Sequence, residues 1–196
     1  MRMTFALLAI CFQATSFAAE PAKPNYYPLV KGTKWEYRLC SEEREISLTC
    51  EIMDSEVREG RTYARMEAHL PNSVTLGEEL STDANGVYRN AIPGAKIQQP
   101  LPIIKYPIKV RDVWKDKIKL GEGDGNVVIT VKDTAAAIEV PAGKFTTLAI
   151  ESIVELNGEK VVASIWYADG IGIVKQQTTS GSRVMLMELK KYMPVR

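Results

Sequence analysis

Apolar and polar side chains alternate with a period of two over several separate stretches of this chain. From Trp35 to Leu39 an apolar residue occupies every second position, and charged residues fill the positions between them. Because successive side chains of a β-strand point to opposite faces, this pattern is typical of strands that bury one face. We therefore predict half-buried antiparallel strands here and at three further places, namely Ala64/Met66/Ala68/Leu70, Val127/Ile129/Val131 and Leu148/Ile150/Ser152/Val154/Leu156.

Dipeptides that favour tight turns separate these stretches. A glycine after Glu, Asn or Asp tolerates the positive φ angles that short hairpins need. A helical pattern is present only as a weak turn around Thr75 to Leu80. The sequence therefore predicts an all-β fold, with turns at Glu59-Gly60, Asn85-Gly86, Asp124-Gly125, Asn157-Gly158 and Asp169-Gly170.

Three short motifs of the first half recur, in the same order, in the second half. Tyr27-Pro28-Leu29 begins eight residues before Trp35, and Tyr106-Pro107-Ile108 begins eight residues before Trp114. The other matches pair 57–60 with 140–143 and 84–87 with 168–171, so the three offsets are 79, 83 and 84 residues. Offsets this similar predict an internal duplication, with antiparallel halves at 27–105 and 106–196.

The stretch that joins the two halves, Ile92 to Pro107, is rich in proline. Proline has no N–H to donate to a neighbouring strand, so we expect an extended connector here rather than a paired strand. A single half would have a small core and exposed edges, whereas two halves joined along an edge or packed face to face would cover both. The sequence therefore predicts one β domain over 19–196.

The first eighteen residues have the features of a bacterial signal peptide. Arg2 precedes the apolar run Phe5–Phe12, and Ser16-Phe17-Ala18 places small residues at the positions that a signal peptidase reads. We predict cleavage after Ala18 and a periplasmic or extracellular protein; an alternative is lipid modification at Cys11. No apolar stretch approaches the about 20 residues that cross a bilayer, so no transmembrane span is predicted.

The mature chain carries no net charge. The full chain has 25 Lys and Arg against 24 Asp and Glu, and removal of Arg2 leaves 24 of each. Binding to nucleic acids and attachment to anionic membrane surfaces both depend on clusters of basic side chains. We therefore expect neither of these as a partner.

Two cysteines, Cys40 and Cys50, remain after cleavage. An even pair in an oxidising compartment predicts a disulfide, which would stabilise the fold by about 2–3 kcal/mol. Strand alternation complicates this pairing, because Cys40 falls on the face opposite Trp35 whereas Cys50 lies on the apolar face of its own strand. A bridge therefore requires a bulge or an early strand end near Cys40.

The motifs that usually mark catalysis or metal binding are incomplete in this sequence. His69 is the only histidine, and it has no partner at ligand spacing. Gly121–Gly125 leads into a strand rather than a helix, which is typical of a hairpin turn and not of a phosphate loop. The carboxylate pairs Glu42-Glu43 and Glu78-Glu79 lie in polar stretches, where acidic residues face solvent. We predict no catalytic residue, no metal site and no cofactor.

Three motifs together resemble a family of exported bacterial β-rich proteins that share a domain of unknown function. They are Pro28-Leu29 with Gly32 and Trp35-Glu36-Tyr37, then 140–145 (V-P-A-G-K-F), then 166–175 (W-Y-A-D-G-I-G-I-V-K). The resemblance covers most of the mature chain and implies a curved antiparallel sheet or barrel-like fold, with no established activity. Arg111 departs from the pattern, because a glycine is usual at this distance before the second tryptophan.

The large aromatic residues are candidates either for the core or for a ligand-binding face. Packing alone accounts for them if the sheet is filled by its own side chains. Alternatively, Trp35, Tyr37, Trp114 and Trp166 line the concave face of a curved sheet that holds an apolar small molecule or a segment of an envelope protein. Since no nucleophile–base pair is evident, we predict an exported, non-catalytic binding or interaction module. The alternative is a cell-envelope enzyme that uses Asp, Glu and Tyr as acid–base groups.

Overall fold

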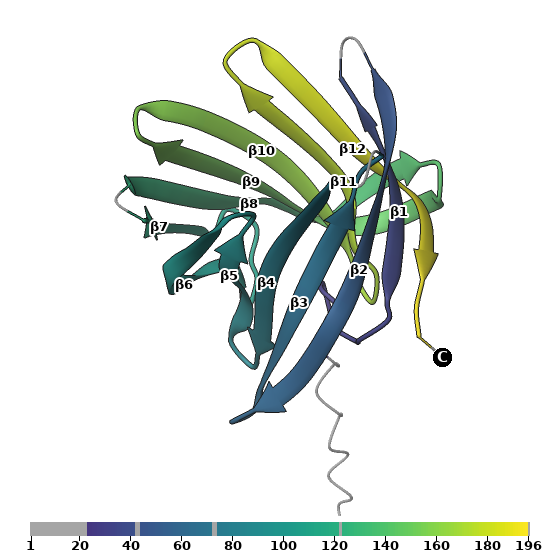
Figure 1. Ribbon diagram of the computed structural model, residues 1–196, viewed down its shortest axis with the longest axis horizontal. Helices are drawn as coiled ribbons and strands as arrows, with labels where there is room; N and C mark the ends of the chain where they lie inside the picture. The colour runs from purple at the N-terminus through teal and green to yellow at the C-terminus, as the bar shows by residue number, and fades with distance from the viewer. Residues whose placement is uncertain (1–22, 42–43, 72–73, 122, 196) are drawn as a thin grey trace, which may run out of the picture.

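The computed structural model describes residues 23–41, 44–71, 74–121 and 123–195, so the predicted signal peptide and Cys11 lie outside the described residues. The described residues form twelve β-strands and no helix, which confirms the all-β prediction (Figure 1). No helix in this part of the chain could therefore serve as a membrane span. The strands are β1 Lys34–Cys40, β2 Glu45–Arg58, β3 Arg61–His69, β4 Thr75–Asp83, β5 Gly86–Ile92, β6 Ala95–Lys105, β7 Val113–Leu120, β8 Gly123–Val140, β9 Gly143–Leu156, β10 Glu159–Ala168, β11 Gly172–Ser180 and β12 Arg183–Met193.

The strands form a closed antiparallel barrel. Each strand pairs with its neighbours in the chain, and β1 also pairs with β12 (Figure 1). Alternation places one face of each strand inside, so Trp35, Tyr37 and Leu39 are buried while the residues between them are partly exposed. The predicted curved or barrel-like sheet is therefore a complete ring.

The two places where the halves of the chain meet are paired very differently. β1 pairs with β12 along its whole length. In the described structure, β6 and β7 share only the residue pair Ile97–Leu120. Trp114 links these two strands elsewhere, because its indole Nε1 donates to the carbonyl oxygen of Pro102 at 2.9 Å. The barrel therefore has one continuous seam and one sparsely paired seam.

The expected connector between the halves is instead strand β6, so this prediction is wrong. β6 pairs with β5, although their register shifts between Arg89 and Ala91. Prolines are tolerated in a strand where no N–H is required, at bulges and along edges. Pro100 and Pro102 therefore fit within β6, because this strand has few backbone hydrogen bonds to make with β7.

The weak helical pattern around Thr75 to Leu80 is also wrong, because these residues belong to β4. Leu76 and Glu78 line the interior of the barrel and Leu80 is fully buried, so the true period is two. The charge of Glu78 at an inward position obscures this alternation in the sequence.

The segment 23–33 crosses the end of the barrel at which β1 begins. The amide of Asn25 donates to Asp169 Oδ1 in the β10–β11 turn at 2.7 Å. Lys23 donates to the carbonyl of Ala84 in the β4–β5 turn, on the far side of the ring. Tyr27 follows these two residues in the chain and is buried in the core. The segment therefore closes this end, and the long β8–β9 hairpin adds to the cover by a hydrogen bond from Ala142 N to Leu189 O of β12 (Figure 1).

The three sequence matches fall on corresponding elements of the two halves. They lie at the starts of β1 and β7, at the β2–β3 and β8–β9 turns, and at the β4–β5 and β10–β11 turns. A backbone contact also repeats with the offset of 79 residues: Gly32 N donates to Ile52 O, and Arg111 N donates to Val131 O. A register shift follows directly after Ile52 and after Val131. These features support the duplication, which stays a prediction.

Candidate functional site

A partly enclosed cavity of about 290 Å³ lies inside the barrel. Its walls come from β1 to β5, β11 and β12, and Tyr27 of the N-terminal segment lies among its lining residues. Apolar and aromatic side chains form most of the lining, with Leu48 and Met66 on the wall. Ligand pockets are typically concave and apolar with a few polar groups that orient the ligand. This cavity is therefore the candidate site.

Aromatic rings pack closely on one side of the cavity. The ring centroid of Tyr27 lies 6.5 Å from that of Trp35 and 6.3 Å from that of Tyr167. The hydroxyl of Tyr37 donates to the carbonyl of Ile173 at 2.9 Å, which fixes its orientation. Burial raises the pKa of both Tyr27 and Tyr37 well above the usual value. These hydroxyls therefore remain protonated and neutral.

An ion pair faces the same cavity. Arg89 Nε lies 3.1 Å from Glu78 Oε2, and Arg89 Nη2 donates to Glu78 Oε1 at 3.5 Å. The two side chains are 30% and 15% exposed, so both are largely withdrawn from solvent. The neighbouring carboxylate of Glu78 raises the pKa of Arg89 despite burial, and the guanidinium is permanently charged. The cavity thus combines apolar walls with one internally neutralised pair.

Cys50 also lines the cavity, and its chemistry is that of an inert thiol. Its side chain is buried, and burial raises its pKa to about 12. Because only the thiolate is an effective nucleophile, Cys50 is unsuited to covalent catalysis at neutral pH.

Two of the four residues predicted for a ligand-binding face line this cavity. Trp35 and Tyr37 do so, whereas Trp114 and Trp166 are absent from its described lining. Trp114 lies at the β6–β7 seam. Trp166 immediately precedes the buried, inward-facing Tyr167 and therefore points outward. Size and hydrophobicity alone did not separate inward from outward tryptophans, but strand alternation at Trp166 could have done so.

The outward surface beside Trp166 carries a charge cluster across β11, β12 and β1. The ammonium of Lys175 lies 5.9 Å from the Trp166 ring centroid and 3.1 Å from Glu188 Oε1, and Arg38 lies 2.7 Å from Glu188 Oε2. Burial opposes ionisation of Glu188, but hydrogen bonds from Arg38 and Lys175 outweigh it and lower its pKa. None of these residues is among those that line the cavity.

The predicted disulfide between Cys40 and Cys50 is not present, and both thiols are free. In the β1–β2 register Cys40 pairs with Glu45, whereas Cys50 pairs with Trp35. The two cysteines are therefore offset by five positions along the strands and lie on opposite faces. Strand β1 ends at Cys40, but its register with β2 is unbroken up to that residue, so no bulge brings Cys40 to the face of Cys50.

Glu78 and Arg89 are the polar site residues that the sequence analysis missed. Glu78 stands between Leu76 and Leu80 at alternate positions, and Arg89 stands two positions after the buried Val87. A charged residue in the inward series of a strand was the available signal. It was overlooked because Glu78 was grouped with its neighbour as part of a polar stretch.

The other residues considered for chemistry do not form a site. His69 is partly exposed, and its Nδ1 lies 3.2 Å from Thr75 Oγ1. Strands β7 and β8 pair as a hairpin, as the interpretation predicted, but Asp124-Gly125 lies within β8 rather than in the turn. Glu42-Glu43 and Glu122 lie outside the described residues. Within the part of the chain that the structure describes, no three His, Cys, Asp or Glu side chains are grouped to hold a metal ion.

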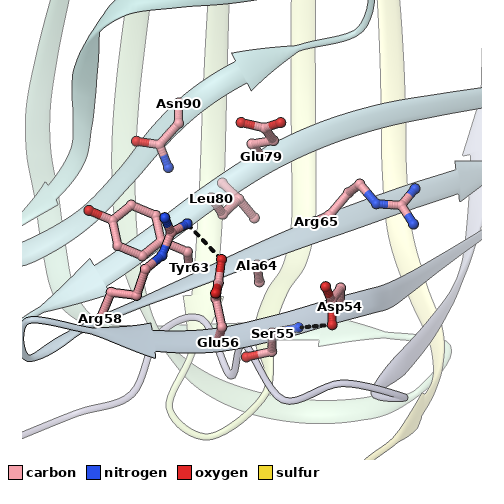
Figure 2. Close-up of a pocket in the computed structure, with 10 residues that line it drawn as sticks. All are labelled: Asp54, Ser55, Glu56, Arg58, Tyr63, Ala64, Arg65, Glu79, Leu80 and Asn90. Carbon is pink, nitrogen blue, oxygen red and sulfur yellow. Dashed lines mark hydrogen bonds and ion pairs between the residues drawn. The ribbon is translucent and has the colours of Figure 1, made fainter.

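A second hollow lies on the outer surface over β2 to β5 (Figure 2). Its volume is about 200 Å³, and charged side chains make up half of its lining. Arg58 contacts Glu56 at 2.6 Å and stacks over the ring of Tyr63 at 4.8 Å. These side chains are well exposed, so the hollow is a weaker candidate than the cavity inside the barrel.

Two solved bacterial structures share this fold. A putative lipoprotein from Parabacteroides distasonis is 11% identical, with a TM-score of 0.60 over 87% of this chain and 99% of that one. A putative exported protein with a YmcC-like fold from Bacteroides fragilis is 10% identical, with a TM-score of 0.63 over 88% of this chain and its whole length. No family model and no curated protein matches this chain. These similarities identify the fold class, a closed antiparallel barrel also found in those two proteins.

Proposed function

We propose that this chain is an exported, non-catalytic binding protein that holds an apolar or amphiphilic ligand inside its barrel. The observation that carries the proposal is the cavity of about 290 Å³ beside Tyr27, Trp35 and Tyr37. Small closed barrels can be filled by their own side chains, and in this twelve-stranded barrel space remains. Export is supported by the predicted signal peptide and accords with the descriptions of the two similar proteins as exported protein and lipoprotein.

The chemical state of the cavity favours binding over acid–base or covalent catalysis. Its carboxylate, Glu78, is paired with Arg89, its tyrosines are held protonated, and the thiol of Cys50 is held neutral. Catalytic acids and nucleophiles usually have pKa values brought near the working pH. The tyrosine and thiol pKa values are shifted in the opposite direction.

The test is binding of the neutral fluorescent probe N-phenyl-1-naphthylamine to purified mature protein, with extraction and mass spectrometry of any co-purified lipid. Ala68 lines the cavity, so Ala68→Phe should occupy its space and weaken probe binding about tenfold or more. Ala137 is an exposed alanine of β8, and Ala137→Phe is the matched control that should bind like the wild type. Circular dichroism establishes that both variants are folded.

Absence of both co-purified lipid and probe binding by the wild type would show that the cavity is not a ligand site. The function would then lie on the outer surface, with an envelope protein as partner.

A further inference from the structure

The Glu78–Arg89 pair stands at a point of the barrel where apolar residues would be expected. Both side chains occupy the inward series of their strands, and Leu80 and Val87 beside them are buried. Burying an ion pair stabilises a fold little, because the desolvation cost offsets the attraction between the charges. An ion pair inside an otherwise apolar cavity is therefore a candidate for binding the polar group of a ligand.

The net charge of the cavity lining determines whether a charged or an uncharged polar group of a ligand can bind. Glu78 and Arg89 are the only charged side chains in the described lining, so the cavity is neutral as a whole. A ligand that brought in an ammonium or a carboxylate would place an uncompensated charge in a poorly solvated site, which is costly. An uncharged polar group carries no such cost.

Hydrogen-bonding capacity points to the same kind of ligand. Arg89 Nε is buried and lacks a well-aligned hydrogen-bond acceptor, although Glu78 Oε2 is 3.1 Å away. The guanidinium has five N–H donors and the carboxylate has only two oxygens. An ester, amide or alcohol oxygen would accept from Arg89, and an alcohol could also donate to Glu78.

Cavity volume limits the size of the ligand. A water-sized group takes about 30 Å³, so 290 Å³ holds about ten heavy atoms. Building on the proposed function, we infer that the cavity selects uncharged medium-chain amphiphiles, such as fatty alcohols and their esters, and that Glu78 and Arg89 determine this selectivity.

The test compares decanol, decanoate and decylammonium, which share a chain and differ in head-group charge. Binding is measured by probe displacement and thermal shift at neutral pH, below the concentrations at which the ligands aggregate. The wild type should bind decanol about tenfold or more tightly than either ion. Glu78→Gln leaves Arg89 unpaired and should shift the preference to decanoate, whereas Arg89→Gln leaves Glu78 unpaired and should shift it to decylammonium.

Glu79→Gln is the matched control, because Glu79 is exposed and lines the outer hollow rather than the cavity. It removes the same charge one position away and should keep the wild-type order. The wild-type order decides the question even if a variant fails to fold. Equal or tighter binding of either ion by the wild type would overturn the inferred selectivity while leaving ligand binding intact. Failure of all three ligands to bind would overturn the proposed function and the selectivity together.

Discussion

Arg111 has a backbone conformation that suits glycine better than any residue with a side chain. Its φ is 71°, and the corresponding residue of the first half, Gly32, has a φ of 87°. Both backbone amides are held in place, since Arg111 N donates to Val131 O at 2.9 Å and Gly32 N donates to Ile52 O at 2.8 Å. The surrounding sheet therefore imposes the left-handed conformation on Arg111, and Arg111→Gly should stabilise the protein.

The magnitude follows from two opposing contributions. A left-handed conformation costs a non-glycine residue about 1–2 kcal/mol. A glycine gives the unfolded chain additional conformational entropy, which costs about 0.5–1 kcal/mol. Arg111 is exposed, and its side chain forms no hydrogen bond or ion pair with the described residues, so its removal costs little. The free energy of unfolding should rise by about 0.5–1 kcal/mol, with an increase in Tm of about 1–4 °C.

Urea unfolding followed by tryptophan fluorescence measures this change directly. Arg111→Ala is the control, because it removes the side chain and keeps the strained backbone, so its stability should stay within about 0.5 kcal/mol of the wild type. The reciprocal change, Gly32→Ala, should destabilise the protein by about 0.5–1 kcal/mol, because the same two contributions act with opposite sign. An Arg111→Gly variant less stable than the wild type would refute the reasoning, since it would mean that the arginine side chain outweighs the backbone strain.

Three further predictions concern processing, thiols and charge. Intact-mass analysis of exported material should give a chain that begins at Ala19, and a lipid-modified mass beginning at Cys11 would contradict it. Thiol titration should find two free cysteines, with Cys40 reactive in the folded protein and the buried Cys50 reactive only after unfolding; a single disulfide-linked species would count against the register. Glu188→Gln should lower the free energy of unfolding by about 1–2 kcal/mol at neutral pH. Because folding lowers the pKa of Glu188, its contribution is fully present above the usual pKa of a glutamate and is lost as the pH falls through the lower pKa of the folded state. The exposed control Glu139→Gln should change stability by less than about 0.5 kcal/mol at any pH, and an equal effect of both variants would rule out a special role for the cluster.

The fold was largely predictable because alternation and turn dipeptides are local signals. The strands around Trp35, Ala64, Val127 and Leu148 all occur where the pattern placed them. Ring closure was less accessible, because it depends on how distant edges meet. The prolines of β6 led to the wrong prediction of an unpaired connector, because the sequence does not show that β6 pairs with β7 at only one position.

The site was predictable only in part, because a cavity depends on which inward residues leave space. Trp35 and Tyr37 follow from alternation, but Tyr27 comes from a segment with no strand pattern, and the pairing of Glu78 with Arg89 depends on the β4–β5 register. The disulfide prediction failed for a related reason. An oxidising compartment and an even number of cysteines say nothing about the register of two strands. In this protein the β1–β2 register keeps Cys40 and Cys50 apart.

The continuous seam between β1 and β12 joins the first and last strands of the described residues. Hairpins such as β2–β3 can form locally, but the β1–β12 contact closes a loop of almost the entire sequence, which makes it a slow and late step of folding. Until β12 is available, β1 and β11 are open edges that can pair with other molecules. Loss of residues 183–193 should therefore lead to aggregation during folding rather than to a slightly less stable monomer.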